Sequence, residues 1–199
     1  SYARALSIMD PAARRSIFSD RMMRELGCYR AEQPLVDLMR SAPARNGLDQ
    51  AQYADLKFWL PGDILTKVDR TSMAVSLEAR EPLLDHRLVE LAACLPQARR
   101  VYGTEGKYAL KRAMTGELPT EILYRAKQGF VLPIAQWFRT DLKETARAAV
   151  RSERLLDTGW FDSEGLSRLA EDHIAGRRDH ARELWQLLML ERSVSLLSN

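Results

Sequence analysis

The sequence predicts a mainly α protein. Apolar residues recur three and four positions apart through most of the 199 residues, as on the buried face of a helix. Aspartates that can cap a helix stand before several of these segments, at Asp10, Asp63, Asp85, Asp162 and Asp179. No run alternates apolar and polar residues as a half-buried strand does, and no internal repeat occurs. These three observations favour helices packed on helices.

Two helices are expected in the first fifty residues. The first is capped by Asp10, has Pro11 at its first position and ends before Gly27. The second covers residues 33–40. The following stretch, 41–50, contains proline, asparagine and glycine, so we expect a loop or hinge there.

The middle of the chain is expected to hold five helical segments. The first, from Tyr53 to Leu60, should break at Pro61 because proline lacks an N–H and clashes with the preceding turn. The segment 78–85 is expected to be an irregular turn, since Pro82 disfavours helix at Glu81. The other four helices are one capped by Asp63, one from Asp85 to Leu95, one over 106–115 and one from Pro119 to Leu123. In the helix from Asp85 to Leu95, Leu88, Leu91 and Ala92 lie on one apolar face.

The last third should contain a loop over 127–132 and three helices. These helices begin at Pro133, at Asp162 and at Asp179, and the last carries Leu184, Trp185 and Leu188 on one face. Large apolar rings bury much surface, so Trp137, Trp160 and Trp185 are expected to anchor the core.

Composition excludes several classes of protein. The hydrophobic content is 46%, which suffices for one domain with its own core, and the net charge of +3 is spread along the chain without a basic stripe, so no nucleic-acid partner is expected. Cys28, Cys94 and the three histidines lack metal-ligand spacing, so no metal site is expected. With no apolar run near the roughly 18 residues of a membrane span and no signal pattern, we expect a soluble cytoplasmic protein without a membrane partner.

Three charged motifs lie among these apolar helices, at residues 65–70, 76–85 and 125–130. Ionised groups removed from water are costly unless they are paired, so such motifs indicate either a paired network or a site. On the turn made rigid by Pro82, Glu78 next to Arg80 can accept a proton or orient a cationic reactant. The alternative is that Glu78 and Arg80 only pair with Arg70 and Asp69 to join two helices.

Two lysines carry a similar pair of alternatives. Lys127, in a loop with Gly129, can stabilise negative charge that develops on a phosphate, or it can be an ordinary solvated lysine. Lys107 follows Gly106 before a helix, but the complete phosphate-binding loop pattern is missing, so it contacts a phosphate or merely caps the helix.

The order of these motifs resembles one known family. The run from Tyr53 to Trp137 and the tail over 175–191 are similar to the C-terminal half of the synthetase domain of glutamine-hydrolysing asparagine synthetases. The family's Ser-Gly-Gly-x-Asp-Ser loop does not occur. The resemblance therefore implies the helical C-terminal portion of an α/β ATP-pyrophosphatase-type synthetase domain, without its nucleotide-loop strand region. We expect one helical unit over 1–199, with a less family-like segment at 1–50, the active-site half at 51–140 and C-terminal helices at 141–199.

The resemblance also implies an activity. Similar enzymes are ATP-dependent and glutamine-dependent amide ligases, which adenylate a carboxylate and transfer to it ammonia from a glutaminase domain. It implies catalytic roles for Glu78, which would handle the attacking amine, and for Lys127, which would face the phosphates, on one cavity wall. Supporting roles fall to Asp69, Arg70, Arg80, Asp85 and Lys107. ATP and Mg²⁺ are the implied cofactors, and the residues that bind them are expected mainly upstream of this chain. The fragment alone is therefore expected to be inactive. A homodimer is one possible oligomeric state.

Small departures from the family pattern leave the acceptor carboxylate open. Glu81 stands where an apolar residue is frequent, and Leu83 and Leu84 stand where an aromatic is frequent. One alternative is therefore a family ligase for an acceptor other than aspartate. The other is a non-catalytic helical interaction module, with the tail helix around Leu184, Trp185 and Leu188 as its surface.

Overall fold

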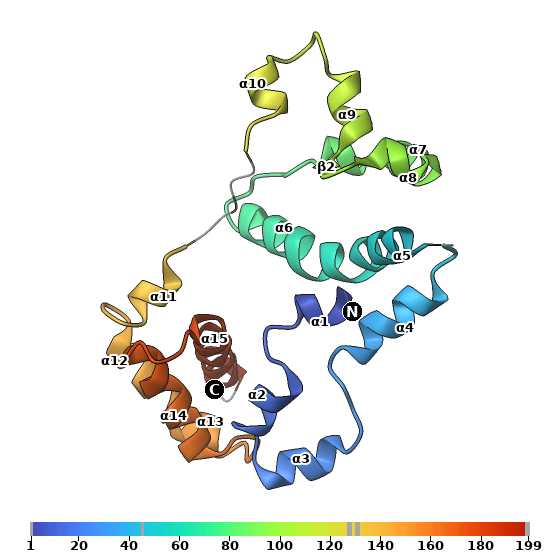
Figure 1. Cartoon of the computed structure of the whole chain (residues 1–199). Helices are drawn as coiled ribbons and strands as arrows, with labels where there is room; N and C mark the ends of the chain where they lie inside the picture. The colour runs from blue at the N-terminus through green and yellow to red at the C-terminus, as the bar shows by residue number, and fades with distance from the viewer. Residues whose placement is uncertain (1, 45, 127–128, 130–131, 198–199) are drawn as a thin grey trace. The chain divides into compact units, whose positions relative to one another are not determined.

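A computed structural model describes residues 2–44, 46–126, 129 and 132–197 of the chain. These residues are mainly helical, with a single two-stranded hairpin, which confirms the predicted fold class (Figure 1). The chain divides into two compact units: unit 1 comprises Ser1–Gln33 and Phe130–Asn199, and unit 2 comprises Pro34–Gly129. The prediction of one helical domain over the whole chain stays a prediction.

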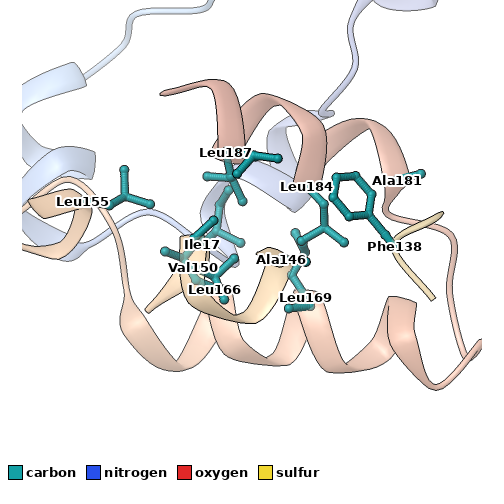
Figure 2. Packing of buried hydrophobic residues seen from close by; sticks show 13 residues of the cluster. Ile17, Phe138, Ala146, Val150, Leu155, Leu166, Leu169, Ala181, Leu184 and Leu187 are labelled. Atoms are coloured by element: carbon teal, nitrogen blue, oxygen red, sulfur yellow. The ribbon is translucent and has the colours of Figure 1, made fainter. Parts of the chain in front are cut away.

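Unit 1 is built from helices at both ends of the chain. They are α1 (Tyr2–Leu6), α2 (Pro11–Arg15), α3 (Asp20–Leu26), α11 (Ile134–Trp137), α12 (Lys143–Val150), α13 (Glu153–Leu156), α14 (Ser163–Ile174) and α15 (Ala181–Leu197). Helix α12 packs against both α14 and α15, and α15 also contacts α11 and α13. Figure 2 shows the side chains buried between these helices, among them Phe138, Val150, Leu166 and Leu184.

The helix expected between Asp10 and Gly27 is two helices. Ser19 separates α2 from α3, and its hydroxyl accepts the N–H of Met22 at the start of α3. The Ser19 N–H donates to the carbonyl of Trp160 at 2.9 Å, and the Asp162 N–H donates to the carbonyl of Ile17 at 2.8 Å. The prediction of one helix was wrong because these bonds to a distant segment hold the backbone at Phe18 and Ser19 outside the helical conformation.

Among the phenylalanine, tyrosine and tryptophan side chains that the structure describes in unit 1, Phe138 is the buried one. Phe138 is 0% exposed, whereas Trp160 and Trp185 are 36% and 37% exposed. The ring of Phe138 lies beside the rings of His173 and Trp185. His173 is also fully buried, and its two ring nitrogens bond to the carbonyl of Ala135 and the N–H of His180, each at 3.0 Å. Trp160 and Trp185 are therefore not buried anchors of the core as expected, although Trp185 contacts Phe138.

Replacing Gly165 by alanine should destabilise unit 1 by about 1–3 kcal/mol. Gly165 lies in the first turn of α14, and a Cβ added there would stand 2.1 Å from the backbone oxygen of Ser16 and 3.1 Å from Cα of Ile17. Backbone atoms cannot rotate away as a side chain does, so α14 would be pushed off the 16–17 segment. Urea unfolding of the chain, followed by far-UV circular dichroism, measures the change.

Gly47→Ala is the matched control for this substitution. Gly47 also lies in the first turn of a helix, and a Cβ there meets no atom within 4 Å. We expect its effect to stay within about 1 kcal/mol, with stabilisation the favoured sign. Equal losses in the two variants would show that the close approach at Gly165 does not decide the stability.

Unit 2 contains the remaining elements. They are α4 (Gln33–Ser41), α5 (Gly47–Ala54), the π-helix η1 (Asp55–Leu65), α6 (Thr66–Met73), the 3₁₀ helix η2 (Pro82–Leu84), α7 (His86–Cys94), α8 (Gln97–Arg100), β1 (Val101–Tyr102), β2 (Glu105–Gly106), α9 (Tyr108–Ala113) and α10 (Thr120–Leu123). None of the helices in the described parts of either unit has both the length and the apolar character of a transmembrane span.

The predicted break at Pro61 was wrong. Helix α5, the π-helix and α6 follow one another without interruption, and Pro61 lies inside the π-helix (Figure 1). A π-helix has a wider turn, so the proline ring avoids the carbonyl four residues earlier that it would meet in an α-helix. The hydroxyl of Thr66 donates to the carbonyl of Pro61 at 2.6 Å. Pro61 therefore lies where the helix changes from α to π and does not mark the end of the helix.

Two further expectations in unit 2 need correction. The segment 41–50 is only partly loop, because α5 begins at Gly47 and is capped by Asn46, whose side chain accepts the N–H of Asp49. The sequence showed no strand, yet β1 and β2 pair antiparallel, with Tyr102 opposite Glu105. Strands of two residues are too short for an alternating pattern to appear in the sequence.

Candidate functional site

The acidic motif at 76–85 forms an exposed turn between α6 and α7. After α6 ends at Met73, Ser76 adopts a left-handed backbone with φ of 58°. The chain then runs without regular structure to Glu81, and Pro82 opens the single 3₁₀ turn η2. This geometry confirms the irregular turn expected from the proline. A positive φ at a non-glycine residue is unfavourable, and such residues are frequent at functional sites.

Arg80 holds the Glu78 carboxylate from within the turn. The Arg80 Nε donates to Glu78 Oε1 at 2.9 Å, and Nη2 donates to Oε2 at 3.1 Å. A two-point contact between guanidinium and carboxylate fixes orientation as well as distance. Both side chains stay largely in solvent, with 81% of Arg80 and 67% of Glu78 exposed. The carboxylate is therefore oriented and also accessible to a reactant.

Glu78 and Arg80 do not pair with Arg70 and Asp69, which was the alternative to a functional role. Asp69 and Arg70 lie exposed on α6, and neither side chain forms an ion pair with another residue that the structure describes. The ion pair of the motif thus joins two residues of one turn and does not join two helices.

Asp85 links the turn to α7. Its carboxylate accepts the N–H of Arg87 at 3.0 Å and also the guanidinium of Arg87, at 3.1 Å to each oxygen. The bond from the Arg87 side chain is the main reason that the pKa of Asp85 is lowered below 3.8, and the backbone N–H groups at the start of α7 add to it. The predicted cap is confirmed.

Replacing Asp85 by alanine should speed amide exchange in the first turn of α7 at neutral pH, because the cap and the ion pair are both lost. Because the pKa of Asp85 is lowered in the folded chain, the stabilisation by its ionised carboxylate is present above about pH 3.8. This stabilisation is lost as the pH falls through the folded-state pKa of Asp85. The excess exchange of Asp85→Ala over wild type should therefore vanish in strong acid. Hydrogen exchange of Arg87 and Leu88 at pH 7 and pH 2.5 measures it.

Asp63→Ala is a suitable control, because Asp63 of the π-helix pairs with Lys67 of α6 and not with α7. A pH-independent difference between Asp85→Ala and wild type would contradict the assignment.

An apolar cavity of about 730 Å³ opens beside this turn within unit 2. Residues of α5, the π-helix, η2, α7, α8, the hairpin and α9 line it. Lys107 lies on this lining together with Leu83 and Leu84 of the acidic motif. The cavity therefore brings together residues from two predicted segments that are more than twenty positions apart.

Lys107 is the second described non-glycine residue with a positive φ, at 59°. It joins the hairpin to α9, and no side-chain cap bonds the start of this helix. The neighbouring rings of Tyr102 and Tyr108 stack at 5.2 Å and hold the hairpin to α9. The left-handed backbone makes Lys107 a turn residue, and its place on the cavity leaves a contact with an anion available to it.

A buried polar group on this cavity was not expected from the sequence. Arg100 donates to Gln52 and pairs with Asp49, so α8 is joined to α5. The Nε of Arg100 is nevertheless buried without a hydrogen-bond acceptor among the residues that the structure describes. The spacing of about fifty residues gives no sequence signal for this contact.

The remaining predicted site residues do not gather at the cavity. Glu78, Asp69 and Arg70 are not on its lining. Lys127 lies outside the described residues, so its place on one wall with Glu78 stays a prediction. Among the residues that the structure does describe, no group of three or more histidine, cysteine, aspartate or glutamate side chains could hold a metal ion.

The mainly helical fold, with its two-stranded hairpin, is consistent with a fragment of a synthetase domain. The chain belongs to the asparagine synthase family, whose model matches residues 3–195. It is 40% identical over 139 residues to a putative glutamine-hydrolysing asparagine synthetase of Mycobacterium tuberculosis, covering 69% of this chain and 21% of that protein. It is 32% identical over 142 residues to glutamine-hydrolysing asparagine synthetase 1 of Bacillus subtilis, covering 71% and 22%.

A shorter match extends to an animal relative. The asparagine synthetase of Gallus gallus is 40% identical over 84 residues, which covers 38% of this chain and 15% of that protein. No solved structure gives a significant match. The chain spans about a fifth of the length of the two bacterial relatives.

Proposed function

We propose that this chain supplies the C-terminal part of the synthetase domain in an ATP-dependent, glutamine-dependent amide ligase. The family match over residues 3–195 carries the proposal. The Mycobacterium tuberculosis and Bacillus subtilis relatives are named as glutamine-hydrolysing asparagine synthetases, the former as a putative one, so an aspartate-like carboxylate is the first acceptor to consider.

The proposed reaction has two steps. A carboxylate oxygen of the acceptor attacks the α-phosphorus of ATP, pyrophosphate leaves, and an acyl-adenylate forms. Ammonia released from glutamine then attacks the acyl carbon, the bond to AMP breaks, and the amine gives up a proton. Each step develops or moves charge that a fixed ionic group can stabilise.

Glu78 is assigned to the second step. Its carboxylate is accessible and is oriented by Arg80, so it can accept the proton of the attacking amine or hold the amine while its charge develops. Arg80 and Asp85 act as positioning residues, because one holds Glu78 and the other fixes the start of α7. Asp69 and Arg70 are assigned a supporting role on α6.

Lys127 is assigned to the first step, where an ammonium group near the leaving pyrophosphate stabilises the transition state more than the ground state. Lys107 is assigned a supporting contact with an anionic group at the cavity. The described residues contain no group of three or more histidine, cysteine, aspartate or glutamate side chains that could hold a metal ion. The Mg²⁺ that the resemblance implies would take its protein ligands from other parts of the polypeptide.

The test compares the complete gene product with the 199-residue chain. Given ATP, magnesium, aspartate and glutamine or ammonia, the complete product should release pyrophosphate in equal amount with asparagine, and the chain alone should release none. A panel of other carboxylates with the same pyrophosphate readout decides the acceptor. Substantial pyrophosphate release by the chain alone would refute the proposed division of the active site, and none with any carboxylate would refute the ligase.

A further inference from the structure

His173 on α14 is the only polar or charged residue that is buried in the described part of the chain. A buried polar side chain costs free energy unless its hydrogen-bonding atoms are paired. Both ring nitrogens of His173 are paired: Nε2 lies 3.0 Å from the carbonyl of Ala135, and Nδ1 lies 3.0 Å from the N–H of His180. Since a backbone N–H can only donate, Nδ1 is the acceptor and Nε2 carries the proton. The ring therefore donates to Ala135.

Ala135 belongs to α11, which is a single helical turn. The four residues of Ile134–Trp137 are too few to form a stable helix by themselves, so contacts with the rest of unit 1 must hold α11. In a regular α-helix the N–H of Arg139 would donate to the carbonyl of Ala135. It donates instead to the carbonyl of Gln136 at 2.9 Å. The carbonyl of Ala135 is thus available to the ring of His173.

Two further contacts join the end of α11 to His173. Nε of Arg139 donates to the backbone carbonyl of His173 at 3.1 Å. The ring of Phe138, which is also fully buried, meets the His173 ring edge-on, with the ring centroids 6.3 Å apart. His173 therefore holds α11 through its ring and through its backbone, and its own helix packs against α12 and α15.

Helix α11 follows the segment that contains Lys127. Ile134, the first residue of α11, is seven positions after Lys127 in the sequence. Unit 2 ends at Gly129 and unit 1 resumes at the next residue, so this segment connects the two units. On its upstream side, within unit 2, Nζ of Lys111 lies 5.0 Å from the centre of the Tyr124 ring. On its downstream side, the segment ends at α11.

The position of a catalytic ammonium group decides how much it contributes. A displacement of about 1 Å can cost a factor of about 10² in rate. A segment that is held at both ends has fewer conformations than one with a free end. Loss of the contacts between α11 and His173 would leave the Lys127 amine in the protein but less often in place. Such a loss lowers kcat more than it raises the KM for ATP.

We propose that His173 is a positioning residue for the first step of the reaction. Its ring holds α11, and α11 holds the downstream end of the segment that contains Lys127. His173 does not touch the reacting atoms and acts through Lys127. This proposal rests on the proposed function, since that function assigns Lys127 to the first step.

Two substitutions of His173 in the complete gene product separate its two bonds. The amide of His173→Asn can reach the place of Nδ1, so it keeps an acceptor for His180 and loses the donor to Ala135. The longer side chain of His173→Gln can reach the place of Nε2, so it keeps the donor to Ala135. Single-turnover pyrophosphate release should fall by roughly 10–100-fold in His173→Asn and by less than about fivefold in His173→Gln. The KM for ATP should stay within about threefold of wild type in both.

A double variant tests whether His173 acts through Lys127. Adding His173→Asn to Lys127→Met should slow pyrophosphate release by less than about threefold, because the group that His173 positions is already absent. Hydrogen exchange gives a readout besides activity. The amides of Trp137 and Phe138, which donate to Pro133 and Ile134, should exchange at least about tenfold faster in His173→Asn than in His173→Gln.

Leu155→Ala is the control for a general loss of stability in unit 1. Leu155 is fully buried like His173, and it lies at the opposite end of the buried cluster from Phe138 (Figure 2). This variant should lower the urea midpoint of unfolding. Its pyrophosphate release should nevertheless stay within about threefold of wild type, since the contacts of α11 with His173 remain.

Arg139→Ala decides the question if His173→Asn does not fold. Arg139 is exposed, so the fold should tolerate its loss. Removing its bond to the carbonyl of His173 should slow pyrophosphate release by roughly three- to tenfold. This effect should also be absent when Lys127→Met is already present.

Equal losses of rate in His173→Asn, His173→Gln and Leu155→Ala would overturn the proposal and make His173 a residue of the core alone. A full further loss when His173→Asn is added to Lys127→Met would also overturn it, as would wild-type release by Arg139→Ala where His173→Asn is unfolded. Failure of the proposed function looks different: the wild-type product then releases no pyrophosphate with any carboxylate. An active wild type with an equally active His173→Asn refutes this proposal and retains the ligase.

Discussion

Replacing Glu78 with glutamine in the complete enzyme should lower the rate of amide formation by roughly 10²–10⁴-fold. Glutamine matches the size of glutamate but carries no charge, so it can neither accept the amine proton nor stabilise a developing ammonium. It also loses the two-point contact with Arg80, whose bonds to Glu78 are 2.9 and 3.1 Å long. Because Glu78 is exposed, the fold should tolerate the change.

The measurement is the rate of asparagine formation from aspartate with ammonia as donor, alongside glutamine hydrolysis by the same preparation. Glutamine hydrolysis should stay within a few-fold of wild type, because Glu78 is assigned to the ligase half-reaction. The matched control is Glu81→Gln, a second exposed glutamate of the same turn. If both variants form amide at the wild-type rate, the role of Glu78 is lost; if both fail equally, the turn matters only for its net charge.

Replacing Lys127 with methionine should lower pyrophosphate release by roughly 10²–10³-fold. Methionine keeps an unbranched side chain of similar length and removes the positive charge, so the negative charge on the leaving pyrophosphate loses its stabilising partner. Since the interaction is assigned to the transition state, the effect should appear mainly in kcat and less in the KM for ATP.

Single-turnover release of pyrophosphate from labelled ATP measures this step without the later transfer of ammonia. Lys57→Met is the matched control, because Lys57 is an exposed lysine on the π-helix without an assigned role. Lys127→Arg should keep part of the activity, since the charge remains while the geometry changes. Wild-type pyrophosphate release by Lys127→Met would remove Lys127 from the mechanism.

Local sequence signals predicted several helix starts, although the cap expected at Asp63 was wrong because Asp63 lies inside the π-helix. Asp85 and Asp162 each accept a backbone N–H in the first turn of the helix that they were expected to cap. The irregular turn before Asp85 also follows from one residue, Pro82, which restricts the residue before it. In such cases the partners lie within four positions along the chain, so the sequence contains the whole interaction.

Features that depend on distant partners were missed. The break between α2 and α3 follows from hydrogen bonds of residues 17–19 to residues 160–162. The contact of Arg100 with Asp49 joins α8 to α5 across about fifty residues. The π-helix through Pro61 was missed for another reason, because proline favours the end of an α-helix and the sequence pattern does not show a change of helix type.

Two helices of the same apolar pattern separate what the sequence determined from what the tertiary structure decided. Sequence spacing alone gave both α7 and α15 one apolar face, and both are helices. Leu184 and Leu188 of α15 are 2% and 7% exposed, so they belong to the core of unit 1 and not to a surface for a partner. Leu88 and Leu91 of α7 are 38% and 61% exposed. Helical periodicity is a property of one segment, whereas burial requires a second segment to pack against it, and only the folded chain shows whether that segment is present.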